Sequence, residues 1–196
     1  SFGGRANAPG SYADTNTIDY VTIQSTGNSQ DFGDLSSITG LNGSSQWGSA
    51  TRAMIGRMSA NVHPTSTLNR VDYVTVQTTG NTVDFGDITY APDGNLTASN
   101  AVRGILAGGY QPSSLNTMCY CTIATTGNFA DFGDLISTVG ESSGVGGRTR
   151  AFFVRDYSNA KVDYVNIAST GNALAWGDLT TTKNHDSMLS NAHGGL

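Results

Sequence analysis

The fold is decided by the sequence IDYVTIQSTGN at residues 18–28, which is followed by DFGDL at residues 31–35. Near copies of this pair begin at Val71, Met118 and Val162. The glycines of the four Thr-Gly-Asn triplets lie 53, 47 and 44 residues apart. Repeats of about 40 to 50 residues are typical of propeller blades built from about four strands. The chain is therefore predicted to be an array of four repeats.

The two ends of the chain are in register with this repeat. Residues 191–196 followed by residues 1–4 read NAHGGL and SFGG, which align with the unbroken sequence NAVRGILAGG at 100–109. We therefore expect one all-β domain over residues 1–196, with four repeats of about 49 residues. The expected fold is a four-bladed β-propeller of four-stranded antiparallel blades, in which the N- and C-terminal segments pair within one blade.

Within each repeat, β-branched and aromatic residues predict a strand at 18–23, and the Asp-Phe-Gly-Asp sequence predicts its hairpin partner. The glycine of Thr-Gly-Asn is expected at a tight primed turn between the two. A further strand begins at an arginine in three repeats, and a run of small residues precedes it. Small residues suit the crowded centre of a ring of blades.

Composition limits the classes of function. With 37% hydrophobic and 13% charged residues, the chain fits a globular protein. The formal net charge is −5, whereas nucleic-acid binding needs clustered Lys and Arg, so we expect no nucleic-acid partner. No apolar run approaches the ~20 residues of a membrane span, so we expect no membrane insertion.

The order of features in residues 103–135 resembles a kelch repeat: an arginine, an apolar strand, Gly-Gly, a variable loop, a strand with tyrosine, a turn, phenylalanine and leucine. The copies differ in wording at four places: Arg57-Met58 and Arg155-Asp156 replace Gly-Gly, Cys119-Tyr120-Cys121 replaces Asp-Tyr-Val, and Ala175-Trp176 replaces Asp-Phe. The full wording resembles repeats in large virion proteins of tailed bacteriophages, notably marine ones. This resemblance implies a kelch-like propeller in a tail fibre or similar appendage, located in the virion or outside the cell. It implies a structural or adhesive role with no catalytic residues and no cofactor.

Two sets of charged residues recur at fixed positions. An Asp follows the glycine of each Phe/Trp-Gly-Asp, and an Arg leads a strand in three repeats; the residues are Asp34, Asp87, Asp134 and Asp178, and Arg52, Arg103 and Arg150. One carboxylate per blade on outer strands cannot converge on Ca²⁺, so we expect no metal site and a structural role in which the Asp side chains accept from backbone N–H groups. The arginines are predicted to pair with a recurrent Asp. A grip on an anionic ligand at the ring axis is the alternative.

Two cysteines lie two residues apart on a predicted strand, at Cys119 and Cys121. An i, i+2 pair on one face of a strand is poorly placed for a disulfide, so free, buried thiols are predicted. A copper site with Tyr120 needs nearby histidines, and the chain's three histidines fall in different repeats.

The variable loops are the predicted binding surface. The loops that follow the Arg-led strands, of which the first is residues 5–17, and the connections that follow DFGDL are expected to share one face of the disc. They carry the candidate residues Tyr12, Asp14, His63, Tyr90, Tyr110, Gln111, Tyr157 and His185. Aromatic rings beside amides and carboxylates are typical of sugar and protein contacts.

These loops predict a module that binds a host-surface glycan or protein, or other virion proteins, and that can form homo-oligomers. A free-standing kelch-like scaffold for protein binding is the alternative. A hydrolase of surface polysaccharide is the third reading, and it requires a pair of carboxylates in a groove.

Overall fold

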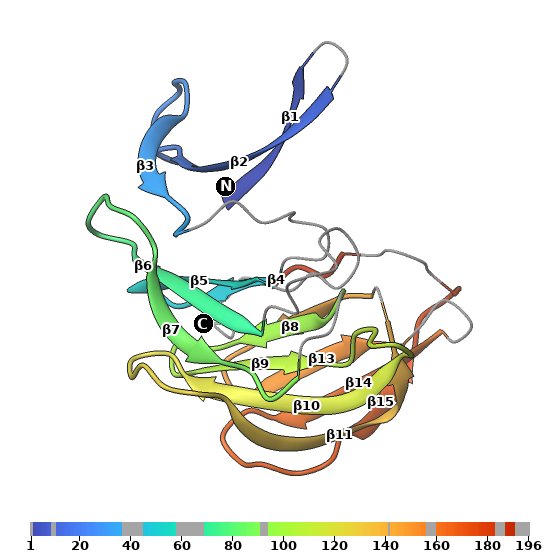
Figure 1. The fold of residues 1–196 in the computed structure, drawn as a ribbon. Coiled ribbons are helices and arrows are strands. Elements are labelled where there is room, and N and C mark those ends of the chain that lie inside the picture. Colours follow the sequence, from blue (N-terminus) through green and yellow to red (C-terminus); the bar gives the residue numbers. More distant parts are fainter. Residues whose placement is uncertain are drawn as a thin grey trace.

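The structure is a computed structural model that describes residues 2–8, 11–36, 45–57, 69–90, 94–140, 142–155, 160–182 and 187–190 of the chain. The described residues form four antiparallel β-sheets (Figure 1). The first sheet contains β1 (Phe2–Ala8), β2 (Ser11–Tyr20) and β3 (Gln30–Asp34). The second contains β4 (Ser45–Gly48), β5 (Arg52–Arg57), β6 (Arg70–Thr75) and β7 (Val83–Asp87). The third contains β8 (Leu96–Ser99), β9 (Arg103–Ala107), β10 (Leu115–Thr122) and β11 (Ala130–Val139). The fourth contains β12 (Gly144–Gly146), β13 (Arg150–Val154), β14 (Lys161–Asn166) and β15 (Leu174–Asp178).

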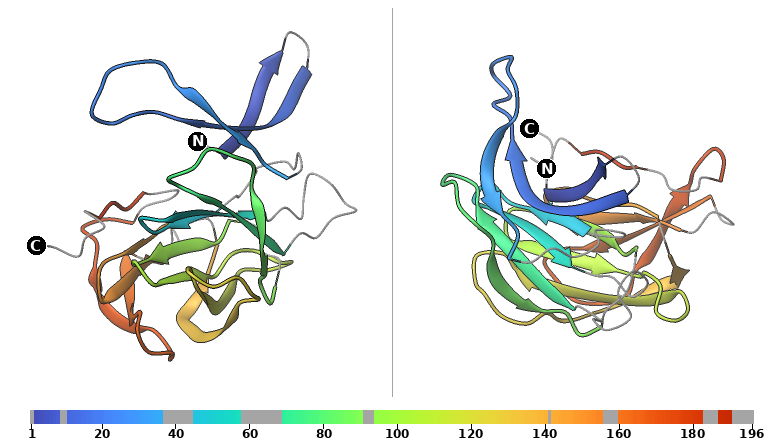
Figure 2. Two further views of the ribbon diagram at one scale, coloured as in Figure 1. Left: turned by 90° about the vertical axis from the view of Figure 1, so that its left-hand side faces the viewer. Right: turned by 45° about the horizontal axis from the view of Figure 1, so that its top comes forward.

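The four sheets follow one another along an arc. Each strand pairs with the next one along the chain within its sheet. The short first strands of successive sheets are in contact, β4 with β8 and β8 with β12. The first sheet lies at one end of the arc and the fourth sheet at the other (Figures 1 and 2). The predicted all-β, propeller-like architecture is confirmed.

The predicted closure of the ring depends on residues 191–196, which lie outside the described residues. The first sheet has three strands among the described residues, one fewer than each of the other sheets. Pairing of the two ends of the chain therefore stays a prediction.

The core lies between successive sheets rather than within one of them. Ile18 and Leu35 of the first repeat pack with Ile55 and Val74 of the second. Larger clusters follow at the next two interfaces; the second holds Trp47, Met54, Phe85, Cys119, Ile123 and Phe129, and the third holds Leu96, Ile105, Met118, Phe132, Phe153 and Ile167. Burial alternates along β4 and β8, as expected for strands with one face toward such a cluster.

The hairpin turn falls earlier than the sequence indicates. In the second repeat the Thr78 N–H donates to Thr75 O at 3.1 Å, and in the third the Thr125 N–H donates to Thr122 O at 3.1 Å. Gly80 and Gly127 come after these turns, so the predicted primed turn at the glycine is wrong. The loop is long enough for a turn at its start, which leaves the Gly-Asn pair free to reach the preceding sheet.

Candidate functional site

The recurrent Gly-Asn pair joins each sheet to the one before it. The Gly80 N–H donates to Phe32 O at 2.7 Å, and the Thr82 N–H donates to Asp34 O at 2.9 Å. In the opposite direction, the Asp34 N–H donates to Asn81 Oδ1 at 2.9 Å. We call these three hydrogen bonds the Gly-Asn clamp.

The same clamp recurs at the two later interfaces. Between the third and second sheets, the Gly127 N–H donates to Phe85 O at 2.8 Å and the Phe129 N–H donates to Asp87 O at 2.8 Å. In return, the Asp87 N–H donates to Asn128 Oδ1 at 3.0 Å. Between the fourth and third sheets, the Gly171 N–H donates to Phe132 O at 2.7 Å and the Ala173 N–H donates to Asp134 O at 2.8 Å. In return, the Asp134 N–H donates to Asn172 Oδ1 at 3.0 Å. The repeated sequence is therefore the interface between repeats.

The clamp explains the glycine of Phe-Gly-Asp. A Cβ atom on Gly33, Gly86 or Gly133 would lie 2.3–2.6 Å from backbone atoms of the clamped glycine in the next repeat. Their φ angles of +148°, +146° and +135° are also ones that other residues rarely adopt.

The clamp uses the main chain of the recurrent Asp residues. The backbone N–H of each of these residues donates, and the backbone C=O accepts; the residues are Asp34, Asp87 and Asp134. The prediction that their carboxylates accept from backbone N–H groups is therefore wrong for the clamp. A carboxylate does accept from a backbone N–H at Asp31, which binds the Gly33 N–H at 3.1 Å. The Asp178 carboxylate pairs with Lys161 at 2.8 Å.

The recurrent arginines stack on tyrosines. The Arg52 guanidinium lies 4.3 Å from the centre of the Tyr73 ring and donates to Ile123 O of the next sheet at 2.7 Å. Arg103 lies 4.7 Å from the Tyr120 ring centre and donates to Ile167 O at 3.0 Å. Among the described residues, neither forms an ion pair with a recurrent Asp, so that prediction is wrong for both. A planar guanidinium stacks on an aromatic face while its N–H groups reach a carbonyl.

In two of the sheets a buried aspartate forms an ion pair with an arginine, and the sequence carries only a weak signal for it. The Asp163 side chain is 1% exposed, and its Oδ1 accepts from Arg155 Nη2 at 2.7 Å. Asp72, equally buried, accepts from Arg70 Nε at 2.7 Å and from the Ser36 hydroxyl of the preceding repeat at 2.9 Å. The signal was the Asp of Asp-Tyr-Val within an apolar strand, because a carboxylate is rarely buried unless it is paired.

Of the loop-face candidates, Tyr90 faces the core. Its ring packs against the cluster that contains Phe85 and Cys119, and its hydroxyl donates to Thr117 O at 2.9 Å. Burial raises the pKa of Tyr90 well above its usual value. Tyr90 therefore holds the second repeat against the third and does not offer its ring to a ligand.

Tyr110 and Gln111 lie on a short ordered loop. Tyr110 is 48% exposed, and Gln111 is partly buried. The Leu115 N–H donates to Gly109 O at 2.8 Å, the Gln111 N–H donates to Ser113 O at 2.8 Å, and Tyr110 forms a β-bridge with Ser114. The loop also contacts the end of β11, because the Gly109 N–H donates to Val139 O at 2.7 Å. That the variable loops and the connections that follow DFGDL share one face of the disc stays a prediction.

The other candidates are placed only in part. Tyr12 and Asp14, expected in a loop over residues 5–17, belong to β2 and pair with Asn7 and Arg5 of β1. That loop prediction is wrong, because Tyr12 and Asp14 pair with β1 in an antiparallel ladder. The side chains of Tyr12 and Asp14 lie outside the described residues, as do the whole of His63, Tyr157 and His185.

Cys119 and Cys121 are free and buried, as the sequence predicts. Burial raises the pKa of each thiol from the ordinary 9.0 to about 12. For Cys119, contact with the Tyr90 side chain offsets part of this rise.

We expect neither thiol to react with a thiol reagent near pH 8 in the folded protein, and both to react in denaturant. Since the unfolded chain loses these protons first, their contribution to stability is complete below about pH 9 and is lost as the pH rises towards 12. Thiol titration and urea unfolding at several pH values would check both points. Rapid labelling of the folded protein would contradict the burial.

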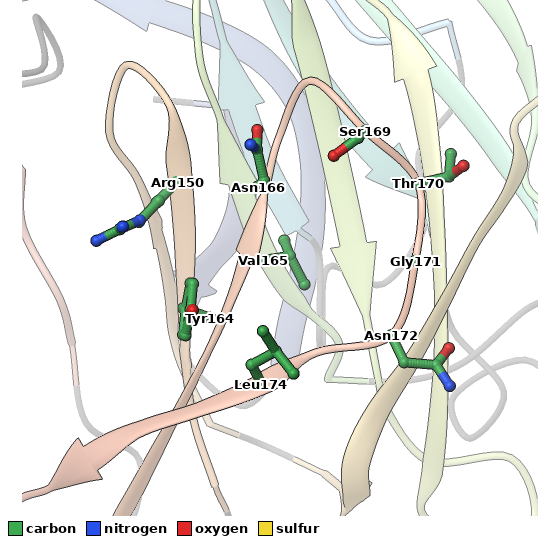
Figure 3. Close-up of a pocket in the computed structure, with 9 residues that line it drawn as sticks. All are labelled: Arg150, Tyr164, Val165, Asn166, Ser169, Thr170, Gly171, Asn172 and Leu174. Atoms are coloured by element: carbon green, nitrogen blue, oxygen red, sulfur yellow. The ribbon is translucent and has the colours of Figure 1, made fainter.

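Two shallow hollows lie beside the hairpin turns. One, of about 320 Å³, lies between Arg150 and Tyr164 on one side and residues 169–172 on the other (Figure 3). Its counterpart in the third repeat, of about 340 Å³, is lined by Tyr120 and residues 125–128. Both are formed by recurrent scaffold residues.

Neither a metal centre nor a membrane-spanning helix is present among the residues that the structure describes. No group of three or more His, Cys, Asp or Glu side chains there could hold a metal ion. No helix in the same part of the chain is long and apolar enough to cross a membrane.

Comparison with known proteins gives the fold alone. No protein-family model matches the chain, and no curated protein is similar to it. The solved structure of YjhT superposes with a TM-score of 0.70 at 9% sequence identity. The superposition covers 95% of this chain and 69% of YjhT. The chain is therefore similar to YjhT in its propeller-like arrangement of sheets.

Proposed function

We propose that this chain is a non-enzymatic adhesive module of a phage tail fibre or similar virion appendage, which binds a host-surface glycan or protein through its loop face. The observation that carries this proposal is the loop at residues 108–114. Its backbone hydrogen bonds hold a half-exposed tyrosine ring at the edge of the third sheet. An aromatic ring that is already ordered loses little entropy when it stacks on a sugar or packs against a protein.

The recurrent residues support the same proposal by their roles in the scaffold. The Gly-Asn clamp uses residues that recur in all four repeats, and the stacked arginines recur in three. Arg52 and Arg103 are engaged with carbonyl groups of the next sheet, which leaves no reason to assign them an anionic ligand. The residues that vary between repeats lie in the loops and are then available for recognition. The kelch-like and phage resemblances of the sequence agree with such a division.

Replacing Tyr110 with Ala is expected to weaken binding to host cells or to a glycan array by at least about tenfold, as loss of a central aromatic contact does. Tyr110→Phe should keep most of the binding if stacking dominates. Val83→Ala, which truncates a comparably exposed side chain on β7, serves as the matched control. Thermal unfolding of each variant would check that the fold is intact. Equal binding by the Ala variant and the wild type would remove Tyr110 from the site.

A further inference from the structure

The first repeat carries one half of a Gly-Asn clamp that no described residue completes. Its Gly27-Asn28 turn corresponds to the pairs that clamp the three later repeats onto their predecessors. Ile23, next to this turn, is 94% exposed, whereas its counterparts in the later repeats are less exposed; these are Val76 at 45%, Ile123 at 1% and Ile167 at 0%. Ser29 is exposed, whereas its counterparts are buried; these are Thr82, Phe129 and Ala173.

The fourth repeat carries the other half. Every residue of β15 is exposed, and Trp176 is 55% exposed, whereas its counterparts Phe85 and Phe132 are each 2% exposed and Phe32 is partly buried. A Cβ atom on Gly177 would have no neighbour within 4 Å, although the same position in the other three repeats is filled by the clamped backbone.

The exposed end of the fourth sheet is already arranged for binding. Arg150 lies 5.2 Å from the Tyr164 ring centre and 5.3 Å from that of Trp176, and these two rings meet edge to face at 5.5 Å. The interface between the third and fourth sheets has a similar arrangement of Arg103, Tyr120 and Phe132. There the Arg103 guanidinium donates to Ile167 O. The fourth sheet therefore has the receiving half of the interface without its partner.

We propose that the fourth sheet binds the Gly27-Asn28 turn of a second copy of this chain, which gives a head-to-tail assembly. By correspondence with the internal clamps, Gly27 N–H donates to Trp176 O and Ser29 N–H donates to Asp178 O. Asp178 N–H donates to Asn28 Oδ1, and Arg150 donates to Ile23 O. Each bond repeats one that is present inside the chain.

The shape of the arc favours a second copy over the chain's own first sheet. The two half-clamps belong to one chain, yet the sheets that carry them lie at opposite ends of the arc (Figures 1 and 2). The same hydrogen bonds at three interfaces set the position of each sheet relative to the one before it. A second copy that binds through these hydrogen bonds adds its first sheet in the same relative position and leaves the three internal interfaces unchanged. The arc also superposes on only 69% of YjhT, which leaves room for further sheets in the same path. Two different surfaces in contact form a heterologous interface, which builds rings or filaments.

The first experiment measures self-association of the chain by sedimentation velocity over the micromolar range. Gly177→Ala adds a methyl group that touches nothing in the single chain but occupies the place of the incoming turn. We expect it to weaken self-association by at least about tenfold while leaving the melting temperature unchanged. Gly147→Ala, in the turn between β12 and β13, is the matched control, because its Cβ would make only an ordinary contact at 3.6 Å. A wild-type chain that is monomeric throughout, or equal weakening by both variants, would overturn the proposal.

The second experiment identifies the occupant. Asn28→Cys is placed in one chain and Asp178→Cys in a second chain of different tagged size, and the mixture is treated with a short bismaleimide. A cross-linked pair that contains one chain of each size is expected, with little background because Cys119 and Cys121 are buried. A single chain that carries both substitutions should cross-link between molecules in proportion to concentration. An internal cross-link that persists at high dilution would instead show a ring closed within one chain and would overturn the assembly.

Discussion

Replacing Gly86 with Ala should destabilise the protein by about 2 to 5 kcal/mol, which combines the cost of overpacking with that of an unfavourable backbone angle. The new Cβ would lie 2.3 Å from Gly127 O, and this carbonyl belongs to a clamped segment that cannot move aside without losing its hydrogen bonds. The φ angle of +146° adds strain for any residue with a side chain. Urea unfolding followed by circular dichroism would measure the loss.

The same substitution at Gly177 is the control for Gly86→Ala. Gly177 occupies the same place in the repeated sequence, but no atom of the single chain lies within 4 Å of the added methyl group. We expect its free energy of unfolding to change by less than about 0.5 kcal/mol. Equal destabilisation by the two variants would mean that the clamp does not account for the requirement for glycine.

Replacing Asp163 with Ala should cost about 3 to 5 kcal/mol, because it leaves a buried guanidinium without its counter-charge. Arg155 is only 13% exposed and binds the Asp163 carboxylate through Nε at 2.9 Å and Nη2 at 2.7 Å. The Ile136 N–H of the preceding repeat also loses its acceptor, which lies at 3.4 Å. Differential scanning calorimetry and urea unfolding would measure the effect.

Two further variants separate the burial of charge from the loss of a contact. Asp178→Ala breaks an ion pair with Lys161 whose side chains are 60% and 47% exposed, so it should cost less than about 1 kcal/mol. The double variant Asp163→Leu with Arg155→Met should recover much of the stability, because no unpaired charge then remains buried. A double variant no more stable than Asp163→Ala would contradict the electrostatic explanation.

The period of the repeat is enough to predict strands and sheets, but it does not show with which repeat each residue forms its hydrogen bonds. Gly80 and Asn81 recur at fixed positions, and the local interpretation of such a pair is a hairpin turn. Their hydrogen bonds go instead to Phe32 and Asp34, about 47 residues earlier in the chain. A repeated pattern records that a residue is needed in every copy, and the partner becomes visible only when two copies are placed side by side.

The arginines and the loop-face candidates show two further limits of the sequence. Opposite charges that recur together suggest an ion pair, yet Arg52 lies against Tyr73 because the two share a face of neighbouring strands. Tyr90 and Tyr110 both lie in variable segments, and only the structure separates the buried ring from the exposed one. In contrast, the burial of Cys119 followed from strand alternation and from the preference of free thiols for the interior.

Because the clamp is made from main-chain atoms, glycine and one asparagine amide, it does not depend on the variable residues that surround it. Duplication or loss of a whole repeat by recombination would join compatible ends each time, with no compensating mutation at the junction. Loops carried by such a repeat could move between positions in the array, or between related genes, as intact units. The clamp therefore allows the number and the order of recognition loops to evolve separately from the stability of the fold.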